Sequence, residues 1–170
     1  VIMYKTTREE SELLNQIRAG TPMGDFLRRY WWPVGFSAHL KNKPTFIRVL
    51  GEDLVLFRSA AGEVGLIEPS CPHRKANLSY GVPEPEGIRC AYHGWVYGLD
   101  GACVDMPNEP NEQFKDKVSV RSYHVEELGG VIFAYVGPDP APLLPRWDLL
   151  VREDIRREIG LTVVDCNWLQ

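Results

Sequence analysis

The sequence predicts a mainly β fold, in which small antiparallel sheets follow helices near the N-terminus. Three observations support this prediction. Short β-branched or aromatic runs follow one another between residues 34 and 68 and are separated by turns that contain Gly. Two further apolar runs meet at a Gly-Gly pair at residues 129–130. Helical periodicity, in contrast, is confined to residues 1–33.

Two helices are expected before the first strand. Residues 7–10 form a capping box, and leucines follow at helical spacing until Gly20, where we expect the first helix to end. A second helix is expected from Thr21 to about Tyr30, because it opens with Thr as N-cap and Pro as first helical residue. We expect the adjacent Trp31 and Trp32 to pack in a core.

Several strands are expected between residues 34 and 170, with one linker among them. The first four are Val34–Phe36, Phe46–Leu50, Leu54–Arg58 and Val64–Glu68. A turn-rich loop is expected at 82–87 and a hairpin turn at Asp100–Gly101, before strands at 118–128, with a break, and at 131–136. Four prolines between 138 and 145 indicate a linker, and Leu161–Val164 is a further strand candidate.

Two short segments combine Cys with His between these strands. Cys71 and His73 are separated by one residue, Cys90 and His93 by two, and sixteen residues lie between the two segments. Side chains two apart on an extended backbone point to the same side, so Cys71 and His73 can act together. Each segment therefore offers one thiolate and one imidazole.

This ligand set occurs in a known metal centre. In a Rieske 2Fe–2S centre, two Cys hold one iron and two His hold the other. Structural zinc bound by two Cys and two His is the alternative, but zinc fingers usually place both Cys in one segment and both His in the other. A third interpretation is that the residues simply pack in the core. The mixed segments favour the iron–sulfur cluster.

Composition limits the other possibilities. The chain has 170 residues and a net charge of −4, which argues against nucleic-acid binding. Its longest apolar run is too short to span a membrane, and its charged first twenty residues do not resemble a signal peptide, so we expect a cytoplasmic location. Cys103 and Cys166 are expected to be free thiols, and His39 and His124 are not expected to bind metal.

The two segments resemble the cluster motif of Rieske non-haem iron oxygenases, which hydroxylate aromatic rings. The matching residues are Cys71-Pro72-His73-Arg74 and Cys90-x-Tyr92-His93-Gly94-Trp95. Three further stretches, 23–34, 100–107 and 166–170, are similar to the phthalate-dioxygenase-like branch. The likeness extends over nearly the whole chain.

The resemblance implies an organisation and a function. It divides the chain into an N-terminal helical segment (1–33), a Rieske 2Fe–2S domain (34–137), a Pro-rich linker (138–150) and the start of a catalytic domain (151–170). Electrons would pass from an NAD(P)H-dependent flavin/iron–sulfur reductase to the cluster, and from there to a mononuclear Fe(II) whose ligands lie beyond Gln170. The full-length protein would be a homotrimer that acts in aromatic hydrocarbon catabolism, with His93 on the side where electrons leave. The present chain would contain no catalytic residue and would not be active alone.

Three residues are candidates for tuning such a cluster. Arg74 follows the first segment directly and could favour the reduced form through its charge. Respiratory Rieske proteins have Ser two residues after the second His, where this chain has Trp95, which cannot place a hydroxyl there. Tyr97 could donate one hydrogen bond to a Cys sulfur. Fewer donors predict a low reduction potential.

A stand-alone Rieske ferredoxin, an electron carrier rather than an enzyme, is the alternative function. Such a carrier would not explain the N-terminal segment that contains Arg28 to Trp32, nor the tail at 166–170.

Overall fold

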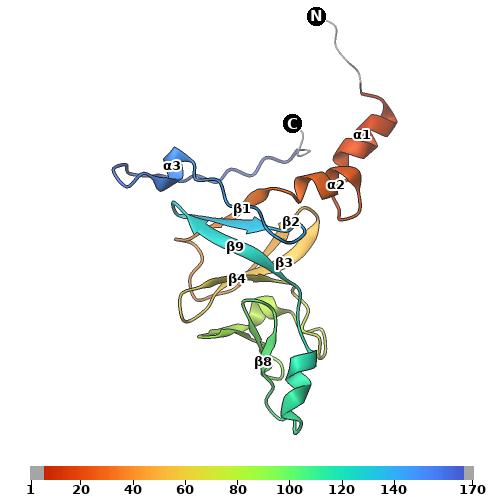
Figure 1. The fold of residues 1–170 in the computed structure, drawn as a ribbon, viewed down its shortest axis with the longest axis vertical. Helices are drawn as coiled ribbons and strands as arrows, with labels where there is room; N and C mark the ends of the chain where they lie inside the picture. Colours follow the sequence, from red (N-terminus) through yellow and green to blue (C-terminus); the bar gives the residue numbers. More distant parts are fainter. Residues whose placement is uncertain (1–5, 167–170) are drawn as a thin grey trace, which may run out of the picture.

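The computed structural model describes residues 6–166, which form two antiparallel sheets (Figure 1). The larger sheet contains β1 (Trp31–Phe36), β2 (Thr45–Val49), β3 (Glu52–Arg58), β4 (Val64–Ile67), β9 (Ser122–Leu128) and β10 (Val131–Tyr135), in the order β1-β10-β9-β4-β3-β2. The smaller sheet contains β5 (Val82–Glu84), β6 (Gly87–Arg89), β7 (Val96–Gly98) and β8 (Cys103–Asp105), in chain order. The predicted mainly β fold is confirmed.

Helical segments are short and lie at the periphery of the sheets (Figure 1). They are α1 (Arg8–Asn15), α2 (Pro22–Leu27), α3 (Asp148–Val151) and the 3₁₀ turns η1 (Leu78–Tyr80) and η2 (Glu112–Lys117). The predicted capping box at the start of α1 is present, because the Thr7 side chain accepts from the backbone of Glu10 and the Glu10 carboxylate accepts from the backbone of Thr7.

The smaller sheet belongs to a segment that leaves the larger sheet and returns to the same place. Strands β4 and β9 pair with each other, with Leu66 opposite Tyr123 and Ile67 opposite Ser122. Residues 68–121, which we call the small lobe, lie between them in sequence. In Figure 1 the small lobe forms the lower end of the molecule. Both Cys/His segments belong to it.

Strand β3 connects the cores on the two faces of the larger sheet. Successive side chains of a strand point to opposite faces. Val55 and Phe57 therefore join a core shared with the small lobe, while Leu54 and Leu56 join a second core on the other face. All four side chains are at most 1% exposed. The small lobe thus packs on a strand that is buried on both faces.

Both N-terminal helices end earlier than predicted. Helix α1 ends at Asn15 rather than near Gly20, and α2 ends at Leu27 rather than near Tyr30. Trp31 and Trp32 lie in β1 and pair with β10, so sheet pairing replaces the last helical turn. The predicted domain boundary at residues 33–34 falls inside this strand.

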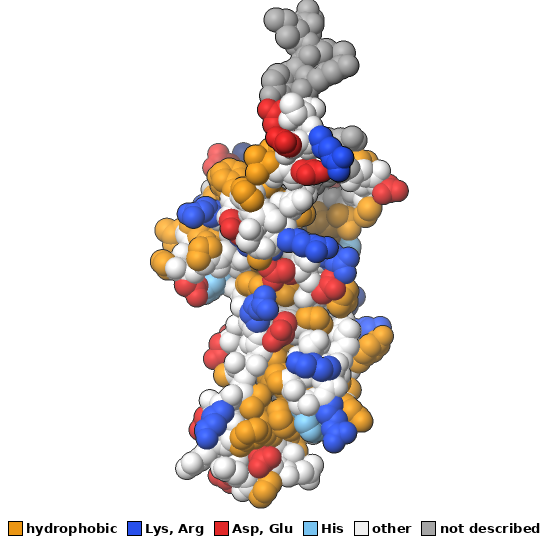
Figure 2. Space-filling view, turned by 90° about the vertical axis from the view of Figure 1, so that its right-hand side faces the viewer, with side chains coloured by type: hydrophobic (Ala, Val, Ile, Leu, Met, Phe, Trp, Pro, Cys, Tyr) orange, Lys and Arg blue, Asp and Glu red, His pale blue; other side chains and the backbone are white. Residues whose placement is uncertain are grey.

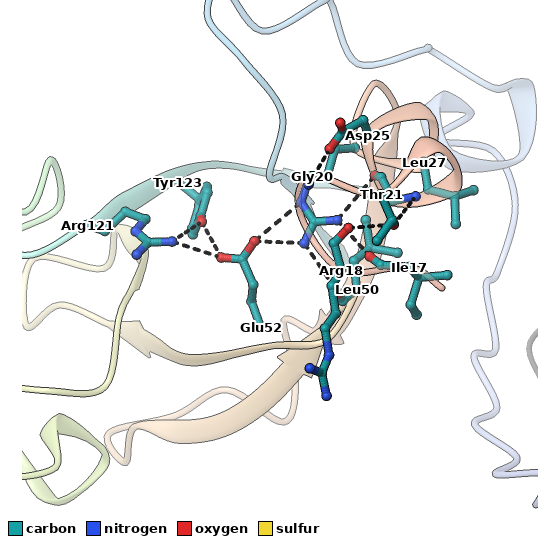
Figure 3. Close-up of polar contacts among 12 residues, drawn as sticks. Ile17, Arg18, Gly20, Thr21, Asp25, Leu27, Leu50, Glu52, Arg121 and Tyr123 are labelled. Atoms are coloured by element: carbon teal, nitrogen blue, oxygen red, sulfur yellow. Dashed lines mark hydrogen bonds and ion pairs between the residues drawn. The ribbon is translucent and has the colours of Figure 1, made fainter. Parts of the chain in front are cut away.

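A buried arginine ties the N-terminal helices to the larger sheet. Figure 3 labels its partners Ile17, Leu50 and Glu52. The Arg28 guanidinium donates to the carbonyls of Ile17 and Gly24 on one side, and to the Leu50 carbonyl and Glu52 carboxylate on the other. Arg28 is 5% exposed. A buried charge of this kind is tolerated because it is paired and fully hydrogen-bonded.

Two strand predictions were wrong. Residues 82–87, predicted as a turn-rich loop, contain a turn only at 85–86, between β5 and the start of β6. Pro83 is accepted in β5 because this is an edge strand, where a missing N–H is tolerated. The candidate strand Leu161–Val164 has no regular structure, since it pairs with no strand in the described part of the chain and its side chains are largely exposed. The predicted hairpin turn at Asp100–Gly101 is confirmed between β7 and β8.

The Pro-rich stretch lies against β1 and β10. The Trp31 indole donates to the Pro142 carbonyl at 2.8 Å, and Leu144 is buried in a core with Phe133. Residues 167–170, most of the tail singled out in the sequence, are outside the described residues.

Candidate metal centre

The two Cys/His segments form loops with the same backbone hydrogen bonds. In the first, the Cys71 N–H donates to the Ala76 carbonyl and the Lys75 N–H donates to the Cys71 carbonyl. In the second, Cys90 and Trp95 make the first of these bonds, and Gly94 and Cys90 make the other. The fifth residue of each loop has positive φ, 58° at Lys75 and 79° at Gly94. The loops are therefore structural equivalents that both begin at Cys.

Although the two loops have the same shape, their histidines occupy different positions in them. His73 is the third residue of its loop, whereas His93 is the fourth residue of the other. The two imidazole rings nevertheless meet, with ring centroids 4.4 Å apart. One tripeptide spacing and one tetrapeptide spacing thus bring two imidazoles together from loops of the same shape.

Burial separates the sulfurs from the imidazoles. Cys71 and Cys90 are 2% and 3% exposed and belong to the core between the sheets. His73 is exposed and His93 is half-buried. Figure 2 shows histidine surface beside Lys or Arg side chains at the small-lobe end of the molecule. The site therefore has an inner thiol side and an outer imidazole side.

The electrostatics show that like groups lie close together. Burial raises the pKa of Cys90, and the neighbouring Cys71 raises it further, against the backbone N–H groups of Tyr92 and His93. Burial lowers the pKa of His93, and His73 and Arg74 lower it further. These shifts keep the thiol protonated and the imidazole neutral in the absence of a cation. A bound metal ion would reverse the balance at sulfur and would benefit from the neutral imidazole.

Two aromatic residues contact one cysteine and one histidine of the site from the protein side. The Tyr97 hydroxyl lies 3.1 Å from the Cys71 Sγ, and Tyr97 is completely buried. The Trp95 indole stacks on His73 with centroids 4.6 Å apart, and its edge meets Phe114. Arg74 is exposed and acts on His93 through its charge.

The donor set fits a cluster of two irons. Two thiolates and two neutral imidazoles supply two negative charges, which balance the 2+ charge of a diferric 2Fe–2S core. In residues 6–166, no three His, Cys, Asp or Glu side chains converge around a point that could hold a single ion. Two irons need only two protein ligands each, and the chain offers a buried Cys pair and an outer His pair.

The remaining cysteines and histidines are not brought to these loops as ligands. Cys103 and Cys166 are free, Cys103 being buried and Cys166 exposed. Burial raises the pKa of Cys103 to about 11. The His39 ring packs against the Phe36 ring, and the His124 Nε2 lies 2.6 Å from the Asp139 Oδ1.

Sequence reasoning missed three features of the site. The equivalence of the two loops could not be predicted, because Lys75 and Gly94 are unlike in side chain although both have positive φ. Phe114 lies in a segment that gave no signal of contact with Trp95. Arg89, directly before Cys90, hydrogen-bonds the second loop, and only its position next to a ligand candidate could have drawn attention to it.

A shallow hollow of about 460 Å³ lies on the imidazole side. It is lined by both histidines, Tyr92 and Trp95, and by residues 107–109.

In the described part of the chain, no helix has both the length and the apolar character needed to cross a membrane.

The chain matches a family model and several characterised proteins. The model described as Rieske [2Fe-2S] domain matches residues 30–124. The chain is 44% identical over 167 residues to the 5,5'-dehydrodivanillate O-demethylase oxygenase subunit of Sphingobium sp., covering 95% of this chain and 39% of that protein. It is 39% identical to the phthalate 4,5-dioxygenase oxygenase subunit of Pseudomonas putida, covering 96% of this chain and 38% of that protein.

A solved structure shows the same architecture. The complex between oxygenase and ferredoxin in carbazole 1,9a-dioxygenase superposes with a TM-score of 0.60 at 30% identity, covering 69% of this chain and 31% of that chain. The chain thus spans less than two fifths of the length of each of these three proteins.

Proposed function

Because the chain belongs to the Rieske [2Fe-2S] domain family, we propose that Cys71, Cys90, His73 and His93 hold one 2Fe–2S cluster. The two cysteines would bind one iron and the two histidines the other. The observation that carries this assignment is the pairing of like groups, with thiols buried together and imidazole centroids 4.4 Å apart. When bound, a cluster of this type takes up and releases one electron at a time.

The surrounding residues have distinct tasks in this proposal. A thiolate ligand carries no proton, so the Tyr97 hydroxyl is the donor in its contact with Cys71. The Trp95 indole covers one face of His73 and limits water at that ring. Arg74 is an exposed cation near His93 and favours the more negative, reduced state.

We further propose that the chain is the electron-transfer part of an aromatic ring-hydroxylating oxygenase α subunit. Identity with two oxygenase subunits over nearly the whole chain supports this function over the stand-alone ferredoxin. In the full-length protein the electron would pass on to a mononuclear non-haem Fe(II). The names of these relatives support an aromatic acid or ether as substrate.

The organisation and partners follow as parts of the same proposal. Residues 34–137 form the Rieske domain, after an N-terminal segment (1–33) and before a linker (138–150) and the beginning of the catalytic domain (151–170). An NAD(P)H-dependent reductase supplies the electrons, directly or through a ferredoxin of the kind seen with the carbazole enzyme. The full-length protein is a homotrimer. Cys103 and Cys166 are both free, which supports a cytoplasmic location.

Metal analysis of the purified chain tests the cluster. We expect two irons and two acid-labile sulfides per chain, with visible absorption that bleaches on reduction. Cys90→Ser and His93→Ala should lose the cluster, whereas Cys166→Ser, at an exposed position, should retain it. One zinc per chain, without sulfide, would refute the assignment.

A turnover assay tests the place of the chain in the oxygenase. The chain alone should accept electrons from a matched reductase but should not oxygenate an aromatic acid. Product formation by the isolated chain would contradict the proposed division of labour.

A further inference from the structure

Arg89 bridges three elements around the second loop. It ends β6 and directly precedes Cys90. Its Nε donates to the Glu84 carboxylate at 2.6 Å, and its Nη1 donates to the Gly94 carbonyl at 2.7 Å and to the Asp105 carboxylate at 3.0 Å. These acceptors lie in β5, in the second loop and in β8 respectively. One side chain thus joins both ends of the small sheet to the loop between its middle strands.

The carboxylates hold the guanidinium in a fixed orientation. Glu84 and Asp105 both raise the pKa of Arg89, and Arg89 lowers the pKa of Glu84. The Arg89 side chain is 31% exposed, so about two thirds of its surface is covered by the protein. A planar fork can serve several acceptors in fixed directions, whereas a lysine ammonium is a point charge on a flexible stem.

The loop tip is enclosed between Arg89 and Pro107. A Cβ placed on Gly94 would meet the Pro107 Cγ at 3.3 Å and the Arg89 Nη1 at 3.7 Å. Gly94 has φ of 79° and directly follows His93. Fixing the Gly94 carbonyl therefore restricts the backbone that carries the His93 imidazole.

The first loop is built differently at the corresponding place. The residue before Cys71 is Ser70, which cannot supply a guanidinium fork. The two loops share their internal hydrogen bonds, but the second has this additional bond from outside. It is also the loop in which Cys and His are separated by two residues rather than one.

We propose that Arg89 is a positioning residue, which through the Gly94 carbonyl holds His93 in the orientation needed to bind iron. This inference rests on the proposed function above. A simple ion pair with Glu84 and Asp105 is the competing role. The ion pair needs only a positive charge, whereas positioning needs the fork.

The test compares wild type, Arg89→Lys and Arg89→Gln as cluster-containing proteins. Iron release to a ferrous chelator and the electron paramagnetic resonance spectrum of the dithionite-reduced protein are recorded. Loss of a residue that orients a metal ligand typically weakens metal binding by about 10–100-fold. Both variants should release iron at least about tenfold faster, with broadened or shifted resonances. Arg48→Lys and Arg48→Gln, at an exposed ion pair with Asp53 in the larger sheet, should match wild type.

Each outcome is decisive. Full rescue by Arg89→Lys would show that charge suffices and would overturn the positioning role, as would wild-type spectra and release in both variants. If Arg89→Gln does not retain a cluster on purification, Arg89→Lys decides alone, with its folding checked by circular dichroism. Absence of iron and sulfide from wild type would refute the proposed function and this inference with it.

Discussion

The indole of Trp95 lies almost parallel to the imidazole of His73, with the two planes 9° apart. Trp95 is 9% exposed, whereas His73 is exposed on its other side. One of the two outer ligand candidates, His73, is therefore supported from the protein side by a large flat side chain. A small residue at position 95, two residues after His93, would leave the His73 ring without this support.

Replacing Trp95 should separate packing from ligation. Trp95→Ser removes the stack and leaves a cavity, so the free energy of unfolding should fall by about 3–5 kcal/mol. Trp95→Phe retains an aromatic face against His73 and should lose less. Stability to urea should fall in the order wild type, Trp95→Phe, Trp95→Ser, and iron release should become faster in the same order. Equal iron release from the Ser and Phe variants would show that the stack does not support His73.

Removing the Tyr97 hydroxyl should lower the reduction potential. A hydrogen bond to sulfur stabilises the more negative, reduced state, and a charge-assisted bond differs between the states by about 1–2 kcal/mol. Since about 59 mV corresponds to a tenfold change for one electron, Tyr97→Phe should lower the potential by about 40–90 mV. Protein-film voltammetry measures this shift. Tyr123→Phe, which loses its contact with Glu52 in the larger sheet, is the matched control and should leave the potential unchanged. A potential in Tyr97→Phe equal to wild type would mean that burial and charge set its value.

A methyl group at Gly87 should disrupt the small sheet. A Cβ at this position would lie 1.9 Å from the Tyr97 carbonyl oxygen on the neighbouring strand. Gly87→Ala must push β6 away from β7, so we expect at least about 1–3 kcal/mol of destabilisation and a lower cluster content per chain. Gly160→Ala, with open space around the new Cβ, should behave like wild type. Iron content and thermal unfolding give the comparison, and an unaffected Gly87→Ala protein would contradict the close packing of β6 and β7.

Glu52 should make stability depend on pH in the acidic range. Burial alone would raise its pKa, but hydrogen bonds from Tyr123 and Arg28 and the charges of Arg28 and Arg121 lower it overall. A carboxylate with a lowered pKa in the folded state contributes stability above its unfolded value of about 4.3, and this contribution disappears as the pH falls through the folded value. Glu52→Gln should therefore cost about 2 kcal/mol at pH 7, and its difference from wild type should shrink below about pH 4.3.

Urea titrations between pH 7 and pH 3.5 measure this difference. Glu63→Gln, at an exposed turn, is the control and should follow wild type throughout. A constant gap between wild type and Glu52→Gln over the whole range would show that the carboxylate charge is not responsible.

The sequence was most informative where residue type alone determines chemistry. The spacing of Cys71, His73, Cys90 and His93 predicts which side chains can meet, and the structure brings the sulfurs and the imidazoles together as two pairs. The apolar run at 54–57 predicts a strand, because β-branched and aromatic residues are favoured there. That both faces of this strand are buried depends on the small lobe, which no local pattern predicts.

The errors came from strand pairing, in one case within a short hairpin and in the other between distant segments. Pro83 and Pro85 indicate a turn locally, but an edge strand tolerates a proline, and pairing with Ile88 decided the outcome. The second helix was predicted to run to about Tyr30 but ends at Leu27, and Trp31 then pairs with Tyr135 in the sheet. The equivalence of the two loops was hidden for a different reason, since backbone geometry can be shared by residues as unlike as Lys75 and Gly94.

The return of the chain to its point of departure has a consequence for how this fold can vary. Glu68 and Arg121, where the small lobe begins and ends, are hydrogen-bonded to each other through their backbones at 2.8 Å. The 52 residues between them therefore begin and end at neighbouring points, so a lobe of another length can replace them if it still packs against Val55, Phe57 and Ile67. The small lobe is an insertion whose two ends are adjacent in space, which is the geometry that exchange between related proteins requires. A chimera joined at these two residues would carry the electron-transfer properties of one relative on the framework of another.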